Sequence, residues 1–235
     1  MPAVLSPSVR LFALSLLSLT VLVPLSTAAD PPENGVAPAV TARAYLQSME
    51  LDFTLSPAGD VIGVMVHCTS DATDDDMALL RHFPRLQKVR VVGMEIHDGG
   101  LKHLKDVPEL KELFLYRDHF TDAGMAHLKD VKKLRKLTLT RAKLTEKGAE
   151  QLAGVTTLEE LEMPGYGLTP AHLEQLKKLP NLKTLTFRGH DLTDADVKAF
   201  AGFPKLTTLK LGSGKITESG LETIRAALPG VTVGY

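Results

Sequence analysis

The 235-residue sequence predicts an α/β solenoid, in which short parallel strands form one concave sheet and helices line its convex side. The first observation is an internal period, because leucine recurs every 24 residues from Leu86 to Leu206. The second is that every unit divides into a strand-like half and a helix-like half. The third is that seven aligned columns are apolar in all six units, although only 44% of the chain is hydrophobic. In the last unit we place Ala227 in the seventh column, with Leu228 as the alternative.

The first half of each unit has the alternation of a β-strand. In LKELFLYRDHF, the unit that begins at Leu110, the apolar columns contain Leu113 and Leu115. Since successive side chains of a strand point to opposite faces, Phe114 and Tyr116 must then point away from the core. The strand is therefore predicted to be buried on one face only.

The second half has the spacing of a helix or a tight 3₁₀ segment, because Met125, Leu128 and Val131 recur every three residues. Its start is marked by Thr in five of six units, at the position of Thr121, and Thr is a good N-cap. An acidic residue follows in five of six units, where it favours the positive end of a helix, and Pro170 takes that position in the other. Four of the helices are followed by prolines, namely Pro108, Pro180, Pro204 and Pro229.

The two ends of the repeat region are less regular, as expected where terminal units cap a stack. We predict repeats over residues 61–229, namely one degenerate unit and six regular units. Residues 38–60 are predicted to form a short helix, a strand and a turn that cap the N-terminal end, and residues 230–235 a capping strand at the other end. Residues 30–37 are predicted to be a flexible leader.

Residues 1–29 have the layout of a cleavable secretory signal peptide. A start that contains Arg10 is followed by 15 residues without a charge, LFALSLLSLTVLVPL, and then by small residues. The alternative is an uncleaved membrane anchor, but a span needs about 20 residues. We therefore predict cleavage after Ala28 or Ala29, a secreted or periplasmic protein, and no membrane association after cleavage. Cys68 is the only cysteine, which excludes an internal disulfide and favours a bacterial periplasm or exterior.

The unit pattern resembles the leucine-rich repeat family, whose core is L-x-x-L-x-L-x-x-N/C-x-L. LKELFLYRDHF matches it except at the Asn/Cys position, and the T-D-x-G-L start of the helical half is similar to ribonuclease-inhibitor-like repeats of secreted bacterial proteins. The resemblance implies a right-handed solenoid and a role in protein–protein interaction. It also implies that the Asn/Cys side chain satisfies backbone groups inside the turn. Here that position holds Met94, Asp118, Ala142, Tyr166, His190 and Gly214, so the turns must be satisfied in another way.

Charged and metal-ligating residues do not indicate catalysis or nucleic-acid binding. The net charge is −1, so no basic excess points to nucleic acid. The stretch SDATDDDM suggests calcium but lacks the alternating ligands of an EF-hand, and the alternative is that Thr73 caps a helix whose first turn is Asp74 to Asp76. The chain contains no G-x-S-x-G and no H-E-x-x-H motif, and we expect no enzyme activity, no cofactor and no metal site.

The histidines and the cysteine leave alternatives open. His103 and His127 share one helical position and are predicted to lie on the solvated convex face. His119 and His190 lie in turns after strands, so a hydrolase that uses these histidines is a less favoured hypothesis. Cys68 is either a packed thiol or a reactive one.

The open face of the sheet carries the candidate binding residues. Between the two core positions of each strand, an outward column contains Phe114 and Thr138, and Tyr116 follows two residues later. Aromatic residues and Arg are enriched at binding hot spots. The alternative is that Phe114 and Tyr116 merely pack across the sheet on Arg90 and Thr138. The candidate protein-binding residues are Arg90, Phe114, Tyr116, Arg117, Arg141 and Arg188.

Together these features predict a secreted or periplasmic module for protein–protein interaction, which binds a protein or peptide on its concave sheet. The first alternative is a structural, self-associating protein of the cell envelope. The hydrolase is the least favoured of the three.

Overall fold

In the computed structural model, the described residues are 39–116, 119–142, 144–165 and 167–234. The predicted signal peptide and leader lie outside these ranges, and so does Arg117. No helix within the described ranges is long and apolar enough to span a membrane.

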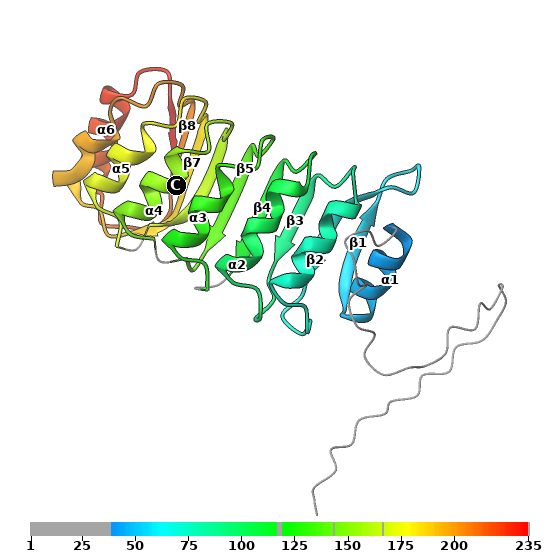
Figure 1. The fold of residues 1–235 in the computed structure, drawn as a ribbon. Coiled ribbons are helices and arrows are strands. Elements are labelled where there is room, and N and C mark those ends of the chain that lie inside the picture. The colour runs from blue at the N-terminus through cyan, green and yellow to red at the C-terminus, as the bar shows by residue number, and fades with distance from the viewer. Residues whose placement is uncertain (1–38, 117–118, 143, 166, 235) are drawn as a thin grey trace, which may run out of the picture. The chain divides into compact units, whose positions relative to one another are not determined.

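Nine strands of the described residues form a single sheet whose strand order follows the sequence (Figure 1). β1 (Leu51–Leu55) is antiparallel to β2 (Val61–Val66), and every later strand is parallel to its predecessor. Parallel neighbours need a crossover connection, which the helical half of each unit supplies. The later strands are β3 (Lys88–Val91), β4 (Glu112–Tyr116), β5 (Lys136–Thr140), β6 (Glu160–Gly165), β7 (Thr184–His190), β8 (Thr208–Leu211) and β9 (Thr232–Gly234).

The helical segments lie along one face of the sheet, and no described helix covers the other face (Figure 1). Each segment contacts only the segments of adjacent units, which is the pattern of a solenoid. Both α-helices and 3₁₀ helices (η) occur, as the three-residue spacing of the apolar columns indicates. The segments are α1 (Ala39–Ser48), η1 (Asp75–His82), α2 (Asp98–Leu101), η2 (Lys102–Asp106), α3 (Asp122–Leu128), α4 (Glu146–Ala153), α5 (Pro170–Leu176), η3 (Asp194–Phe200) and α6 (Glu218–Ala227).

The seven apolar columns form one continuous core between the sheet and the helices. All of the 42 predicted positions are buried except Leu144, which is partly buried, and Ala227, which is exposed. The placement of Ala227 in the last column is wrong, because Leu228, the residue after α6, is buried in its stead. Burying a leucine-sized side chain contributes about 1.5–3 kcal/mol, so these columns stabilise the fold without a disulfide.

An acidic side chain at the start of one helix links that unit to the next. Asp98, the first residue of α2, accepts hydrogen bonds from the backbone N–H (2.8 Å) and the hydroxyl (2.5 Å) of Thr121 in the following unit. The acids that were expected to favour helix starts therefore also join neighbouring units. The same two bonds join Asp122 to Thr145, at 2.9 and 2.5 Å, and Asp194 to Thr217, at 2.8 and 2.6 Å.

The glycine of the T-D-x-G start makes room for this carboxylate. A Cβ added to Gly124 would lie 2.2 Å from Asp98 Oδ1, and one added to Gly220 would lie 2.2 Å from Asp194 Oδ1. Neither glycine has a φ in the left-handed region. The glycine is therefore required by the close approach of the neighbouring side chain and not by its own backbone conformation.

Where no such carboxylate is available, the residue at the glycine position caps its own unit. Pro170 offers no acceptor to Thr193, and Asp196 Oδ2 accepts from the backbone N–H (2.9 Å) and the hydroxyl (3.0 Å) of Thr193 instead. Asp76 does the same for Thr73 in the degenerate first unit, at 2.8 and 2.9 Å. The Thr at a helix start is thus bound either by an Asp of the preceding unit or by an Asp of its own unit.

The SDATDDDM stretch belongs to this capping arrangement. η1 begins at Asp75, one residue later than the sequence predicts, and Asp76 is the buried acceptor. Asp74 Oδ1 accepts from the backbone N–H of His97 at 2.6 Å in the next unit. Within the described ranges, no group of three or more His, Cys, Asp or Glu side chains is placed to hold a metal ion.

The turn position that holds Asn or Cys in the family pattern is filled in several ways. His190 is 3% exposed and fits because the next unit has Gly214, whose Cβ would lie 2.0 Å from His190 Cε1. Burial lowers the pKa of His190, and its Nδ1 has no hydrogen-bond partner among the described residues. Met94 is exposed, while Asp118 and Tyr166 lie outside the described ranges.

Candidate functional site

The helix-free face of the sheet presents one column of side chains in register across the strands. Pairing places Arg90 of β3 opposite Phe114 of β4, and Phe114 opposite Thr138 of β5. Thr138 was expected to be open to solvent, but it is only 6% exposed between its neighbours Phe114 and Glu162. The full column is Asp52, Met65, Arg90, Phe114, Thr138, Glu162, Thr186, Lys210 and Gly234.

Phe114 and Tyr116 form the aromatic centre of this face. Their rings are nearly parallel, with centroids 6.4 Å apart and an interplanar angle of 8°. The guanidinium of Arg90 lies 4.6 Å from the centroid of the Phe114 ring, within the range of a cation–π interaction. The contact with Arg90 is the one that the packing alternative predicts. Both aromatic side chains are nevertheless only half-buried, so each keeps a surface that another molecule can contact.

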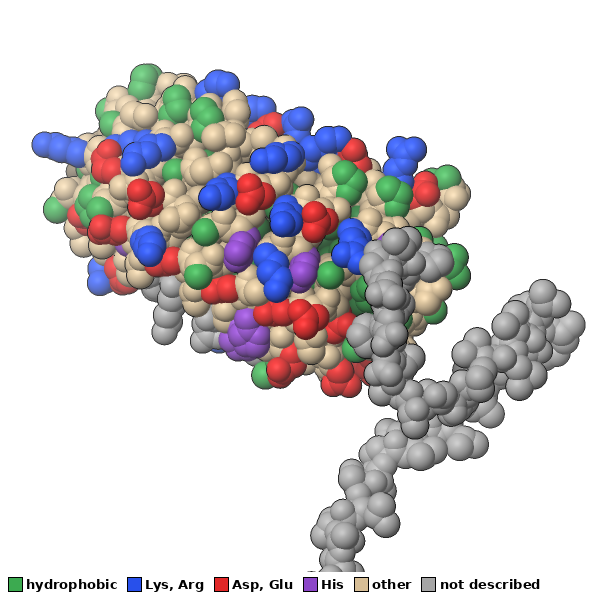
Figure 2. All heavy atoms as spheres, viewed as in Figure 1, with side chains coloured by type: hydrophobic (Ala, Val, Ile, Leu, Met, Phe, Trp, Pro, Cys, Tyr) green, Lys and Arg blue, Asp and Glu red, His purple; other side chains and the backbone are tan. Residues whose placement is uncertain are grey.

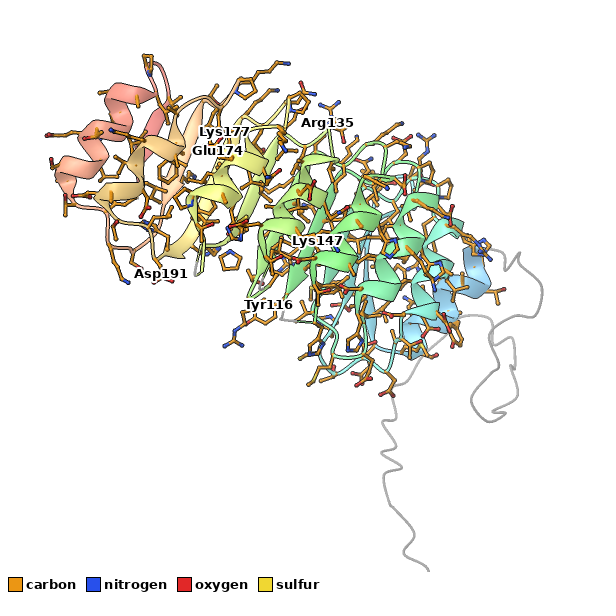
Figure 3. All side chains as sticks on the ribbon, turned by 60° about the vertical axis from the view of Figure 1, so that its left-hand side comes forward. Tyr116, Arg135, Lys147, Glu174, Lys177 and Asp191 are labelled. Carbon is orange, nitrogen blue, oxygen red and sulfur yellow. The ribbon has the colours of Figure 1, made fainter. Side chains whose placement is uncertain are left out.

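The strand ends beside the aromatic centre include a strained residue. Tyr116 is the last residue of β4 and lies near the lower edge of the molecule in Figure 3. Arg141 directly follows β5 and has a φ of 65°, in the left-handed region where Gly189 of a later unit has a φ of 76°. Holding a residue other than glycine there costs about 1–2 kcal/mol. Arg141 is exposed, and the equivalent Arg117 lies outside the described residues.

A shallow hollow of about 160 Å³ opens on the same face. Its charged lining is Lys88, Arg90, Glu112 and Lys136. Lys88 Nζ lies 2.8 Å from Glu112 Oε2, and Lys136 Nζ lies 2.8 Å from Glu160 Oε2. The hydrogen bond to Glu160 is the main cause that raises the pKa of Lys136. Three cations and one carboxylate line the hollow, so its lining has a net positive charge at neutral pH.

Sequence reasoning missed the row of charges that borders this hollow. Lys88, Glu112, Lys136 and Glu160 occupy one position in four successive units, and the strand register places them side by side. They alternate in sign, so neighbours across the sheet attract one another. Alternating charge at the 24-residue spacing is the signal that could have revealed them.

Arg188 lies on the same face but in a different environment. Its guanidinium pairs with the carboxylate of Glu162 on the neighbouring strand. β7, which carries Arg188, is three strands from β4, or about 14 Å at the usual strand spacing. The structure therefore brings Arg90, Phe114 and Tyr116 together and leaves Arg188 apart from them.

The two histidines of the hydrolase hypothesis are far apart. His190 is buried at the end of β7, whereas His119 follows β4, three strands away. A separation of about 14 Å is too large for two groups to act on one bond. His119 instead stacks on His97, with ring centroids 4.8 Å apart and an interplanar angle of 7°.

The other singled-out side chains lie away from this face. His103 and His127 are half-buried rather than fully solvated, and burial is the main cause that lowers the pKa of His103. Cys68 is exposed and not packed in the core. The adjacent His67 contacts Asp52 across the β1–β2 pair, with Nε2 2.7 Å from Oδ2.

Comparison with known proteins agrees with the repeat. The sequence model of a family described as "Leucine Rich repeat" matches residues 178–201, which is the length of one unit. No curated protein matches the chain. The crystal structure of an internalin from Listeria monocytogenes is similar at 17% identity over 68% of this chain and 56% of the internalin chain, with a TM-score of 0.33. The chain thus spans just over half the length of that protein.

The assignment rests on features that occur together in one chain. Six units of 24 residues share one set of buried columns, and a family sequence model matches one of these units. Each unit contributes one parallel strand and one helical segment to a coil in which only adjacent units touch. The chain has the fold of a leucine-rich repeat solenoid, and residues 178–201 match the leucine-rich repeat family.

Proposed function

We propose that this protein is a secreted or periplasmic interaction module that binds a protein or peptide on the helix-free, concave face of its sheet. The observation that carries the proposal is the cluster of Arg90, Phe114 and Tyr116, which we call the aromatic patch. Arg90 and Phe114 also line the shallow hollow, on a face that no described helix covers.

The aromatic patch has the composition of a binding hot spot. Tyr and Arg are over-represented among the residues whose truncation weakens protein interfaces most. Aromatic rings supply a large contact area, and Tyr adds a polar end. The rings extend from β4, which is hydrogen-bonded to β3 on one side and β5 on the other. A ligand therefore meets a preformed surface, and little conformational entropy is lost on binding.

The binding test compares three forms of the mature chain as bait in envelope extract from the producing cells. The first is the natural sequence, the second carries Phe114→Ala with Tyr116→Ala, and the third carries Thr186→Ala. Thr186 is a matched control because it occupies the same outward column on β7. We expect the double variant to bind the purified partner at least about tenfold more weakly, since each lost anchor costs more than about 1 kcal/mol. Equal binding by all three forms would refute the concave site.

Location outside the cytoplasm is supported by the uncharged run LFALSLLSLTVLVPL and the small residues that follow it. The test is the mass of the protein recovered from cells that express the full chain. We expect a mature chain that begins at Ala29 or Asp30 in the periplasmic or culture fraction. A full-length chain in the cytoplasm contradicts this part of the proposal.

Self-association is the competing function, and one observation favours it. The outer edge of β9 has no partner strand among the described residues, and an open strand edge is a template for another chain. Light scattering over a wide range of concentrations separates the two functions. A monomer throughout supports the interaction module, whereas assembly that persists in the Phe114→Ala, Tyr116→Ala variant supports self-association.

A further inference from the structure

The charge of the helix-free face differs from that of the whole chain. The chain has a net charge of −1, yet six cations outnumber three carboxylates on strands β3 to β8 of this face, counting Arg141 at the end of β5. Asp52 of β1 lies outside this set and contacts His67. Every carboxylate of the set already has a cationic partner. Glu112 pairs with Lys88, Glu160 with Lys136 and Glu162 with Arg188, while Arg90, Arg141 and Lys210 have no ion pair among the described residues.

The unpaired cations are placed around the aromatic patch. Arg90 is exposed and is held over the Phe114 ring, 4.6 Å from its centroid. A guanidinium fixed in this way keeps its planar N–H groups free for a carboxylate, which it can bind through two parallel hydrogen bonds. Arg141 lies beyond Tyr116, two strands from Arg90. Cationic groups therefore stand on both sides of the aromatic rings.

We infer that the partner offers an acidic peptide segment, with one carboxylate on Arg90 and an apolar or aromatic side chain on the rings of Phe114 and Tyr116. This inference rests on the proposed function and names the chemistry of its partner. Arg90 and Arg141 are two strands apart and about three residues apart along the strands, so their backbones are separated by about 14 Å. That distance corresponds to about four residues of an extended peptide. The segment therefore carries two acidic residues about four positions apart, with an apolar residue between them.

The surroundings of the patch favour a short acidic segment over a long polyanion. Lys and Arg line the upper edge of the molecule in Figure 2, where Figure 3 labels Arg135, whereas Asp and Glu gather toward the lower edge, where Figure 3 labels Asp191. Tyr116 lies near that lower edge. Acidic residues of the helix starts, such as Asp98 and Asp122, would repel a polymer that continues past the patch. A segment that ends within a few residues avoids them.

The test measures binding of fluorescent polymers to the mature chain by anisotropy. The probes are all short, about ten residues or nucleotides long: a random copolymer of glutamate and tyrosine, polyglutamate, a copolymer of lysine and tyrosine, and single-stranded DNA. We expect the glutamate–tyrosine copolymer to bind at least about tenfold more tightly than each of the other three, and to lose affinity as salt is added. Equal binding of polyglutamate or DNA would show general attraction of polyanions and overturn the inference, as would equal binding of the lysine copolymer.

Two charge-removing variants locate the contact. Arg90→Gln is expected to weaken binding of the glutamate–tyrosine copolymer about tenfold and to reduce its salt dependence, because one charge-assisted contact is lost. Arg188→Gln is the matched control, since Arg188 is exposed on the same face but is already paired with Glu162, and it should change binding less than twofold. Equal loss in both variants overturns the inference.

The natural partner separates failure of this inference from failure of the proposed function. If Phe114→Ala with Tyr116→Ala abolishes binding of the partner, but Arg90→Gln and salt do not affect it, the concave site is supported and the acidic segment is refuted. If the aromatic substitutions do not change binding of the partner, the concave site itself is refuted.

Discussion

The two halves of the repeat region solve the same structural problem with different side chains. In the N-terminal half, residues 86–157, each helix start donates hydrogen bonds to an Asp of the unit before it, and for the first helix start that Asp is Asp74 of the degenerate unit. In the C-terminal half, residues 158–228, Thr193 is capped from within its own unit, and only Thr217 receives two bonds from the preceding unit. Thr169 stands between the two arrangements, because its N–H donates to His172 Nδ1 of its own unit, while its hydroxyl contacts both His172 Nδ1 and Glu146 of the preceding unit.

The helix-free face differs between the same two halves. The N-terminal half presents Arg90 with its guanidinium over a ring and no ion pair among the described residues. The C-terminal half presents Arg188, which is paired with Glu162. The buried columns are alike in both halves, so the 24-residue period depends on the core and not on any one polar link. Polar positions are free to differ, and the difference leaves a cation without an ion pair beside the aromatic rings in one half, among the described residues.

The largest effect on stability is expected where a glycine makes room for a link. Gly124→Ala should lower the free energy of unfolding by about 2–3 kcal/mol, because its Cβ displaces the Asp98 carboxylate from Thr121. Urea denaturation measures this change. In an Asp98→Ala background the same glycine substitution should cost less than about 1 kcal/mol, because the carboxylate is absent. Equal costs in the two backgrounds would contradict the proposed role of the glycine.

A smaller effect is expected at the self-capped unit. Asp196→Ala should cost about 1–2 kcal/mol, since Thr193 then loses the single acceptor of both its hydrogen bonds and Pro170 cannot replace it. The combination of Pro170→Asp with Asp196→Gly converts this unit to the linked arrangement of the N-terminal half. It should recover most of the lost stability in thermal denaturation. A double variant no more stable than Asp196→Ala would show that the two arrangements are not interchangeable.

The smallest of the three effects is a dependence of stability on pH, to which His190 of the C-terminal half contributes. Burial lowers the pKa of His190 below its ordinary value of about 6.5. As the pH falls through about 6.5, the unfolded chain therefore binds more protons than the folded chain, and the free energy of unfolding decreases. For one group the decrease is at most about 1.4 kcal/mol per pH unit, and it stops below the folded-state pKa. His190→Asn should reduce this slope in urea denaturation between about pH 8 and 5 without abolishing it, because His82 and His103 also have lowered pKa values. If the slope of unfolding free energy against pH is unchanged in His190→Asn, protonation of His190 does not destabilise the folded chain.

The fold could be predicted from the sequence because it depends on positions that repeat. The register that sends Leu113 inward and Phe114 outward holds in every unit, and the structure confirms it. The burial of Thr138 could not be predicted, since it depends on how far the side chains of neighbouring strands reach over it. Likewise the sequence predicts only that Asp98 favours the start of its own helix. Its bond to Thr121 depends on how the next unit packs in space, which the sequence of one unit does not specify.

The candidate site could be predicted only in part for the same reason. The column that contains Arg90 and Phe114 follows from the register, but the cation–π contact follows from rotamers that the sequence does not specify. The pairing of Arg188 with Glu162 joins residues 26 positions apart, one unit plus two, and so falls outside the alignment of equivalent positions.

The alternation of links and self-caps restricts how such a chain can gain or lose units. A unit that carries glycine at the third helical position relies on an acid in the unit before it, as Thr217 relies on Asp194. Deletion of residues 182–205 would place Pro170 before Thr217 and leave that helix start without an acceptor. Duplication of the unit that contains Asp122 and Gly124 would instead produce two matching junctions. The repeat can therefore lengthen by copying its regular units, whereas shortening is tolerated only where an acid still precedes each glycine.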